Sequence, residues 1–198
     1  MEDEIKNVLE TMHEVGDEAE DSLLYLQTSL IYNTTTLLSE CSSKVKQIKE
    51  IEYQVSKKIK DLARYNPDLD PYILVPSHLS KIGDNIERLR ELVDKKVREN
   101  ILFDDKSITE ITFLLERLMD ILRTVSDLIF TRNIFLGRYI QESEAGVMRR
   151  AIEYSTLHEE RLIEGSALPV VSQLYINMLD AIKGIAWHAK AIAKKLTG

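Results

Sequence analysis

Residues 76–89 read Pro-Ser-His-Leu-Ser-Lys-Ile-Gly-Asp-Asn-Ile-Glu-Arg-Leu, and they predict the helix around which the rest of the chain is organised. Gly83 lies within its apolar stripe, where a glycine costs about 1 kcal/mol relative to alanine, so we expect a close packing contact there. Asp84 follows directly, at the edge of the stripe. The stripe itself recurs at steps of three and four residues, which places its members on one helical face: Leu79, Ile82, Ile86, Leu89 and Val93.

The composition indicates a soluble, cytoplasmic protein with a substantial core. The chain has 198 residues, of which 44% are hydrophobic and 30% charged, and its seven glycines and four prolines favour long helices with short connections. A net charge of −7 argues against a general nucleic-acid binder. The single cysteine, Cys41, rules out an internal disulfide, and we expect it to be a small packed residue. We expect no signal peptide, and no window approaches the ~18 consecutive apolar residues of a membrane span.

The same spacing of apolar residues predicts five further helices. They cover about residues 5–30, 38–62, 108–129, 135–164 and 170–196. Polar or proline-containing breaks separate the helices at residues 33–36, 66–71, 103–107 and 165–169. Within the second break, Asp70 and Pro71 resemble an N-cap followed by a proline at the first helical position. Pro76 then predicts either a kink in the organising helix or its true start.

The second half of the chain repeats the first at an offset of 103 residues. Residues 185–188 of the last predicted helix align at this offset with residues 82–85 of the organising helix. The fourth helix repeats the first, because Ile108, Ile111, Leu115 and Leu118 align with Ile5, Val8, Met12 and Val15. We therefore expect an all-α protein of two tandem, pseudo-symmetric three-helix bundles, residues 1–102 and residues 103–198, packed side by side.

Two tandem three-helix units that carry Leu-Ser-Lys-Ile-Gly-Asp-Asn-Ile at residues 79–86 resemble the PhoU family. In that family the segment typically reads Leu-Glu-Arg-Ile-Gly-Asp-His-Ala, and the second copy here keeps His188 and Ala189. The linker at residues 100–107 also resembles the linker between the repeats of PhoU-like domains, which are found appended to sodium/phosphate cotransporters as well. The resemblance implies a regulator of phosphate uptake.

The resemblance also implies a metal site. Several PhoU proteins bind metal clusters through pairs of acid-x-x-x-Asp motifs, one cluster per repeat; residues four apart share a helical face, so two pairs can converge on one cation. Glu116 and Asp120 form an intact pair, and His13 and Asp17 occupy the equivalent positions. Asp84 keeps its place, but its expected partner position holds Ser80. The corresponding pair in the second repeat is Lys183 and Trp187, and a lysine opposes a bound cation. We therefore expect either no metal or a divalent or iron cluster at the first repeat.

No stretch of the chain predicts catalysis. The sequence lacks a glycine-rich phosphate loop, a His-Glu-x-x-His motif and a nucleophile elbow. We expect a non-enzymatic regulator of phosphate transport or phosphate signalling that docks on a transporter or a sensor kinase. The resemblance also implies a homodimer, with membrane contact only through such a partner. The alternatives are a helical adaptor or structural module unrelated to phosphate, and a metal-binding protein.

Three residues outside the predicted metal site also stand out. His158 lies next to Glu159 and Glu160, which is typical of a solvated helix face. His188 is expected to cap the core at the end of a bundle, and Trp187 to pack or to contact the neighbouring Lys183 and Lys190.

Overall fold

The computed structural model describes residues 2–165 and 168–198, and this part of the chain is helical, with six α-helices and one 3₁₀ helix. The first half holds α1 (Glu2–Ile31), α2 (Leu38–Ala63), the 3₁₀ helix η1 (Pro67–Tyr72) and α3 (Val75–Arg98). The second half holds α4 (Asp105–Thr131), α5 (Ile134–Ile163) and α6 (Pro169–Thr197). The predicted six helices are confirmed. The predicted break at residues 165–169 includes residues 166 and 167, which lie outside the described part.

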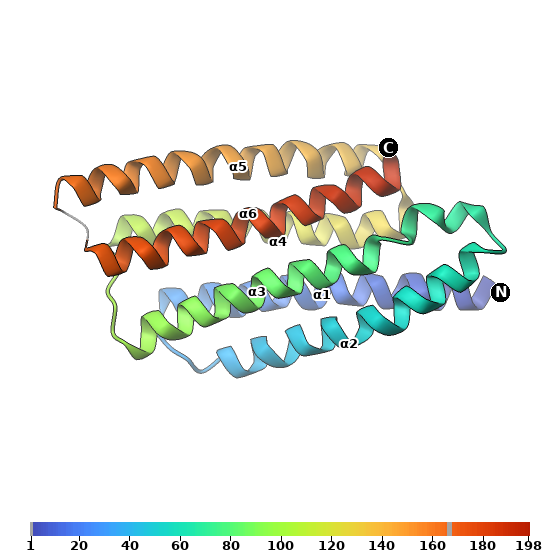
Figure 1. Cartoon of the computed structure of the whole chain (residues 1–198), viewed down its shortest axis with the longest axis horizontal. Coiled ribbons are helices and arrows are strands. Elements are labelled where there is room, and N and C mark those ends of the chain that lie inside the picture. Colours follow the sequence, from blue (N-terminus) through green and yellow to red (C-terminus); the bar gives the residue numbers. More distant parts are fainter. Residues whose placement is uncertain (1, 166–167) are drawn as a thin grey trace.

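The helices form two three-helix bundles that lie side by side along their length. Figure 1 shows α2 and α5 at opposite edges of the molecule, with α1 beside α4 and α3 beside α6 between them. One hydrophobic cluster draws buried residues from all six helices, so the two bundles share a single continuous core. The all-α fold of two tandem three-helix bundles is therefore confirmed.

The local sequence explains where the helices begin, although the predicted N-cap at Asp70 is wrong. Asp104 caps α4, because its carboxylate accepts a hydrogen bond of 2.6 Å from the backbone N–H of Ser107. Asp70 is not an N-cap, since Pro71 lies inside η1 and Asn66 caps that helix by accepting from the N–H of Asp68. Pro76 marks the true start of α3, where a missing N–H costs nothing.

Gly83 lets α2 and α3 pack closely, as the sequence predicts. A β-carbon at this position would lie 3.1 Å from Cγ2 of Ile48, which is tighter than ordinary van der Waals contact. The same α3 segment therefore presents one side to α2 through Gly83. Another side of the segment packs against α6. The exposed residues along this α3–α6 contact are described next.

Candidate functional site on helices α3 and α6

Asp84, the residue that carries the family resemblance, is held by two lysines. Nζ of Lys49 on α2 lies 2.7 Å from its Oδ1, and Nζ of Lys81, one turn earlier on α3, lies 3.0 Å from its Oδ2. Burial alone would raise the pKa of Asp84, but the hydrogen bonds from the two lysines outweigh it and lower that pKa. The carboxylate is therefore ionised and already neutralised by protein cations.

The other predicted metal ligands fall into two separate places on α1 and α4. Nδ1 of His13 lies 3.2 Å from Oδ2 of Asp17, and the imidazole packs against Phe130 with ring centroids 4.9 Å apart. Glu116 instead lies opposite Gln27, whose amide donates to it at 3.2 Å. His13 and Gln27 are 14 positions apart on one helix, which is about 21 Å at 1.5 Å per residue.

Glu116 and Asp120 line one shallow cavity with Glu20 and Asp21 of α1, and Arg123 also borders it. Arg123 pairs with Glu20, and Arg117 lies 3.6 Å from Asp120. The structure thus places Glu116 and Asp120 beside other acidic residues and arginines. It does not bring them together with His13 and Asp17, their equivalents in the first repeat.

These surroundings do not fit a metal cluster. Within residues 2–165 and 168–198, no three His, Cys, Asp or Glu side chains are placed to hold one metal ion. At Asp84 both carboxylate oxygens already accept from ammonium groups, and an approaching cation would meet the same positive charge. Metal binding at Asp84, His13, Asp17, Glu116 or Asp120 stays a prediction.

An aromatic cluster joins α3 to α6 beside Asp84. Nδ1 of His78 lies 3.1 Å from Nδ1 of His188, so one ring nitrogen donates and the other accepts. Trp187 packs edge-on against both imidazoles, with centroid distances of 4.7 Å to His188 and 6.1 Å to His78. Burial lowers the pKa of both histidines, and each is further lowered by a nearby cation, Lys195 for His78 and Lys81 for His188. The pair is thus neutral at pH 7.

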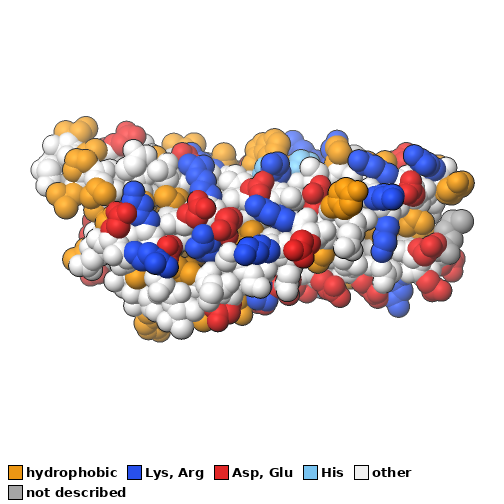
Figure 2. Space-filling view, turned by 60° about the horizontal axis from the view of Figure 1, so that its bottom comes forward, with side chains coloured by type: hydrophobic (Ala, Val, Ile, Leu, Met, Phe, Trp, Pro, Cys, Tyr) orange, Lys and Arg blue, Asp and Glu red, His pale blue; other side chains and the backbone are white. Residues whose placement is uncertain are grey.

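We call the exposed surface around this cluster the α3–α6 face. It is formed by His78, Lys81, Asp84, Trp187 and His188. Trp187 is 52% exposed and its ring packs against the two histidines, which is the packing alternative that the sequence offered beside a lysine contact. Figure 2 shows a side of the molecule on which Lys and Arg side chains are spread among Asp and Glu, with a histidine beside hydrophobic side chains. His188 contacts His78 across the seam between the two bundles, and so it does not cap an end of the bundle.

A buried polar network lies elsewhere, where α4, α5 and α6 meet. Glu110 accepts two hydrogen bonds from Arg161, at 3.2 and 2.9 Å, and a third from the hydroxyl of Tyr175. The prediction for His158 was wrong, because this side chain is 1% exposed and stacks on Tyr175. Its Nδ1 accepts from Arg161, so its Nε2–H donates to Ser172, and both burial and Arg161 lower its pKa.

Cys41 is fully buried, as predicted, and its thiol donates to the carbonyl of Ser22. Burial raises the pKa of this thiol to about 12, so it is protonated and unreactive at neutral pH.

Two three-helix bundles built from one repeated unit place the chain in the class of tandem helical-repeat proteins. Within that class, similar solved structures show that the chain has the PhoU fold. The phosphate transport system regulatory protein PhoU from Streptococcus pneumoniae matches with a TM-score of 0.85 at 11% identity, over 98% of this chain and 93% of that one. PhoU from Pseudomonas aeruginosa matches with a TM-score of 0.77 at 15% identity, over 98% of this chain and 96% of that one.

A PhoU-like protein from Shewanella oneidensis MR-1 matches with a TM-score of 0.61 at 14% identity, over 95% of this chain and 94% of that one. No protein-family model and no curated protein sequence matches the chain. The resemblance to PhoU drawn from residues 79–86 is thus confirmed at the level of the fold.

Proposed function

We propose that the chain is a non-enzymatic, PhoU-like regulator of phosphate transport or phosphate signalling that acts by docking on a transporter subunit or a sensor kinase. The proposal is supported by the shared fold with the phosphate transport system regulatory protein of Streptococcus pneumoniae, which extends over nearly the whole of both chains. Among the helices of residues 2–165 and 168–198, none could span a lipid bilayer. We place the protein in the cytoplasm and assign any membrane contact to its partner.

The observation that carries the docking proposal is Trp187. A half-exposed tryptophan that packs edge-on against two imidazoles is already ordered, so little side-chain entropy is lost when a partner covers it. Lys183 lies one turn before Trp187 on α6 and pairs with Asp180, while Lys81 and Lys195 act on His188 and His78. We therefore infer a partner surface with an apolar pocket and an acidic rim, because complementary charge steers association.

The test is co-purification with defined candidates. Tagged protein is produced together with the phosphate-transporter ATPase subunit or the phosphate sensor kinase from the same organism. Trp187→Ala should reduce recovery of the partner by about tenfold or more, as expected for an interface anchor. Tyr53→Ala on α2 is the matched control, since Tyr53 is also an exposed aromatic side chain, at 76% exposure, and should leave recovery unchanged.

Two results together would overturn the proposal: recovery of neither component, and a deletion strain whose phosphate-regulated expression is unaffected. The same pair of results would favour the helical adaptor. The proposed homodimer is tested separately by light scattering on the purified chain, where a mass near twice 22.8 kDa is expected.

A further inference from the structure

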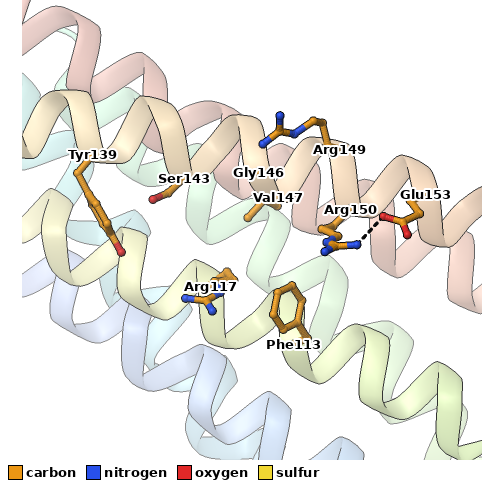
Figure 3. Close-up of a pocket in the computed structure, with 9 residues that line it drawn as sticks. All are labelled: Phe113, Arg117, Tyr139, Ser143, Gly146, Val147, Arg149, Arg150 and Glu153. Atoms are coloured by element: carbon orange, nitrogen blue, oxygen red, sulfur yellow. Dashed lines mark hydrogen bonds and ion pairs between the residues drawn. The ribbon is translucent and has the colours of Figure 1, made fainter.

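A groove of about 500 Å³ runs between α4 and α5, away from the α3–α6 face. Figure 3 shows Phe113 and Arg117 of α4 along one side, and Tyr139, Ser143 and Arg150 of α5 along the other. The ring of Tyr139 extends across the groove toward α4. A concave site of this volume is within the range that single small ligands occupy.

The groove is basic, although the chain as a whole is acidic. Its lining includes three arginines, Arg117, Arg149 and Arg150, against a single acidic residue, Glu153. Figure 3 shows the guanidinium groups of Arg117 and Arg150 between α4 and α5, and that of Arg149 on the side of α5 away from α4. The whole chain has a net charge of −7, so this concentration of positive charge is local. Arg150 lies 2.7 Å from Glu153, and Arg117 lies 3.6 Å from Asp120, so each guanidinium is oriented while more than half of its side chain stays exposed.

The positive groups stand next to aromatic walls and hydroxyl donors. The guanidinium of Arg117 lies over the ring of Phe113, 5.2 Å from its centroid, which fixes the cation at the groove. A planar guanidinium binds phosphate oxygens in a bidentate manner, and the hydroxyl groups of Tyr139 and Ser143 can add neutral donors. The rings of Phe113 and Tyr139 offer faces for a planar group of the ligand.

Gly146 keeps the groove open. It lies in the middle of α5, where glycine costs about 1 kcal/mol relative to alanine. A close helix contact does not explain it, because a β-carbon at this position would meet no atom within 4 Å. Any larger side chain at this position would instead project into free space beside the other groove residues.

We propose that the α4–α5 groove binds a small phosphate monoester that carries a planar ring, a ligand of mononucleotide size. The phosphate dianion pairs with Arg117 and Arg150 from the two sides of the groove. The ring lies toward Tyr139, because Figure 3 shows Phe113 beside Arg117 and Arg150 and Tyr139 further along the groove. The site uses none of the residues of the α3–α6 face, so ligand binding and partner docking can be tested separately.

The experiment is isothermal titration of the full chain with four ring-bearing monoesters: AMP, UMP, pyridoxal 5′-phosphate and flavin mononucleotide. Ribose 5-phosphate and inorganic phosphate test the phosphate group alone, and adenosine tests a ring alone. We expect at least one of the four to bind more tightly than ribose 5-phosphate, inorganic phosphate and adenosine. Arg117→Gln and Arg150→Gln should each weaken that binding by about tenfold or more, because each removes a charge-assisted contact.

Arg64→Gln is the matched control. Arg64 also forms an exposed ion pair three residues along its helix, with Asp61 at 3.3 Å, but it lies on the first bundle outside the groove. Gly146→Leu separates binding from folding. Leucine should fill the groove and abolish binding while leaving the melting temperature equal or higher, since its β-carbon meets no neighbour and glycine is the poorer helix former.

Absence of binding by all four monoesters would overturn the proposal. Equal binding by Arg117→Gln, Arg150→Gln and the wild type would also overturn it, because the ligand would then lie elsewhere. If inorganic phosphate bound as tightly as the ring-bearing esters, the groove would be a simple anion site. The proposed contribution of the ring to binding would then be wrong.

Discussion

A β-carbon placed on Gly184 of α6 would lie 2.5 Å from Oδ1 of Asn85 on α3, and 2.8 and 2.9 Å from the other two atoms of that amide group. The amide is held in place, because its Nδ2 donates to the carbonyl of Lys81 at 2.9 Å. The two bundles therefore touch on the α3–α6 side at a position that has room only for glycine.

Gly184→Ala should lower the free energy of unfolding by about 1 kcal/mol, since an overpacking cost of about 1–3 kcal/mol is partly offset by the better helix propensity of alanine. Urea denaturation measures the change. In an Asn85→Ala background the three crowding atoms are gone, and Gly184→Ala should then be neutral or stabilising. Equal effects in both backgrounds would show that the contact is not the cause.

Tyr175→Phe should cost about 2 kcal/mol of stability, because its hydroxyl donates to the buried side chain of Glu110, which also accepts from the Arg161 cation. Tyr72→Phe should cost about 1 kcal/mol, since the hydroxyl of Tyr72 donates at 2.8 Å to the neutral carbonyl of Ile129. These two tyrosines stand 103 residues apart, so each serves as the control for the other. Thermal and urea unfolding would contradict this account if Tyr72→Phe proved the more costly.

Stability should fall as the pH drops below 6.5. His78, His158 and His188 have folded-state pKa values lowered by burial, so just below 6.5 the unfolded chain binds more protons than the folded one. Their contribution is complete above 6.5 and is lost as the pH falls toward the folded-state values. The lowered pKa of Asp84 and Asp104 acts in a separate window, below 3.8.

Urea denaturation at a series of pH values between 8 and 5 measures the loss of stability that the three histidines cause. His158→Gln keeps a donor near Ser172 but removes one titrating group, so the stability of this variant should depend less steeply on pH. An unchanged slope would assign the effect to His78 and His188 alone.

The purified protein should contain no stoichiometric transition metal. Lys49 and Lys81 occupy both oxygens of Asp84, and the acidic pair on α4 faces Arg123 and Arg117. Elemental analysis of protein prepared without chelators decides the point. A full equivalent of iron, zinc or manganese that disappears in Asp84→Asn or in Glu116→Gln would restore the cluster implied by the resemblance.

The apolar spacing predicted the helices well because burial, rather than local propensity, decides where they form. The last helix was expected from residue 170 and begins at Pro169, and the second was expected over residues 38–62 and covers Leu38–Ala63. The start of α3 was harder to predict from the sequence, because a helix could begin at either Pro71 or Pro76. A short 3₁₀ helix accommodates Pro71, and Pro76 lies in the first turn of α3, which begins at Val75.

The polar interior of the second bundle was missed for a physical reason. His158 and Glu144 look like surface residues in sequence, because the groups that satisfy them come from elsewhere: Lys190 of α6 lies 2.7 Å from Glu144, and Ser172 of α6 accepts from His158. The repeat did contain a signal. At the offset of 103 these two residues align with Cys41 and Val55, both of which are buried.

The pairing of α1 with α4 and of α3 with α6 means that each half offers the same surface to the other, as subunits do in an isologous dimer. On a two-fold axis of that kind, a residue meets its own copy. Glu20 and Arg123 are equivalent positions, and they form an ion pair across this contact. Two separate subunits of one sequence would oppose glutamate to glutamate there. A single chain that carries both copies can hold glutamate in one and arginine in the other, which makes this contact attractive.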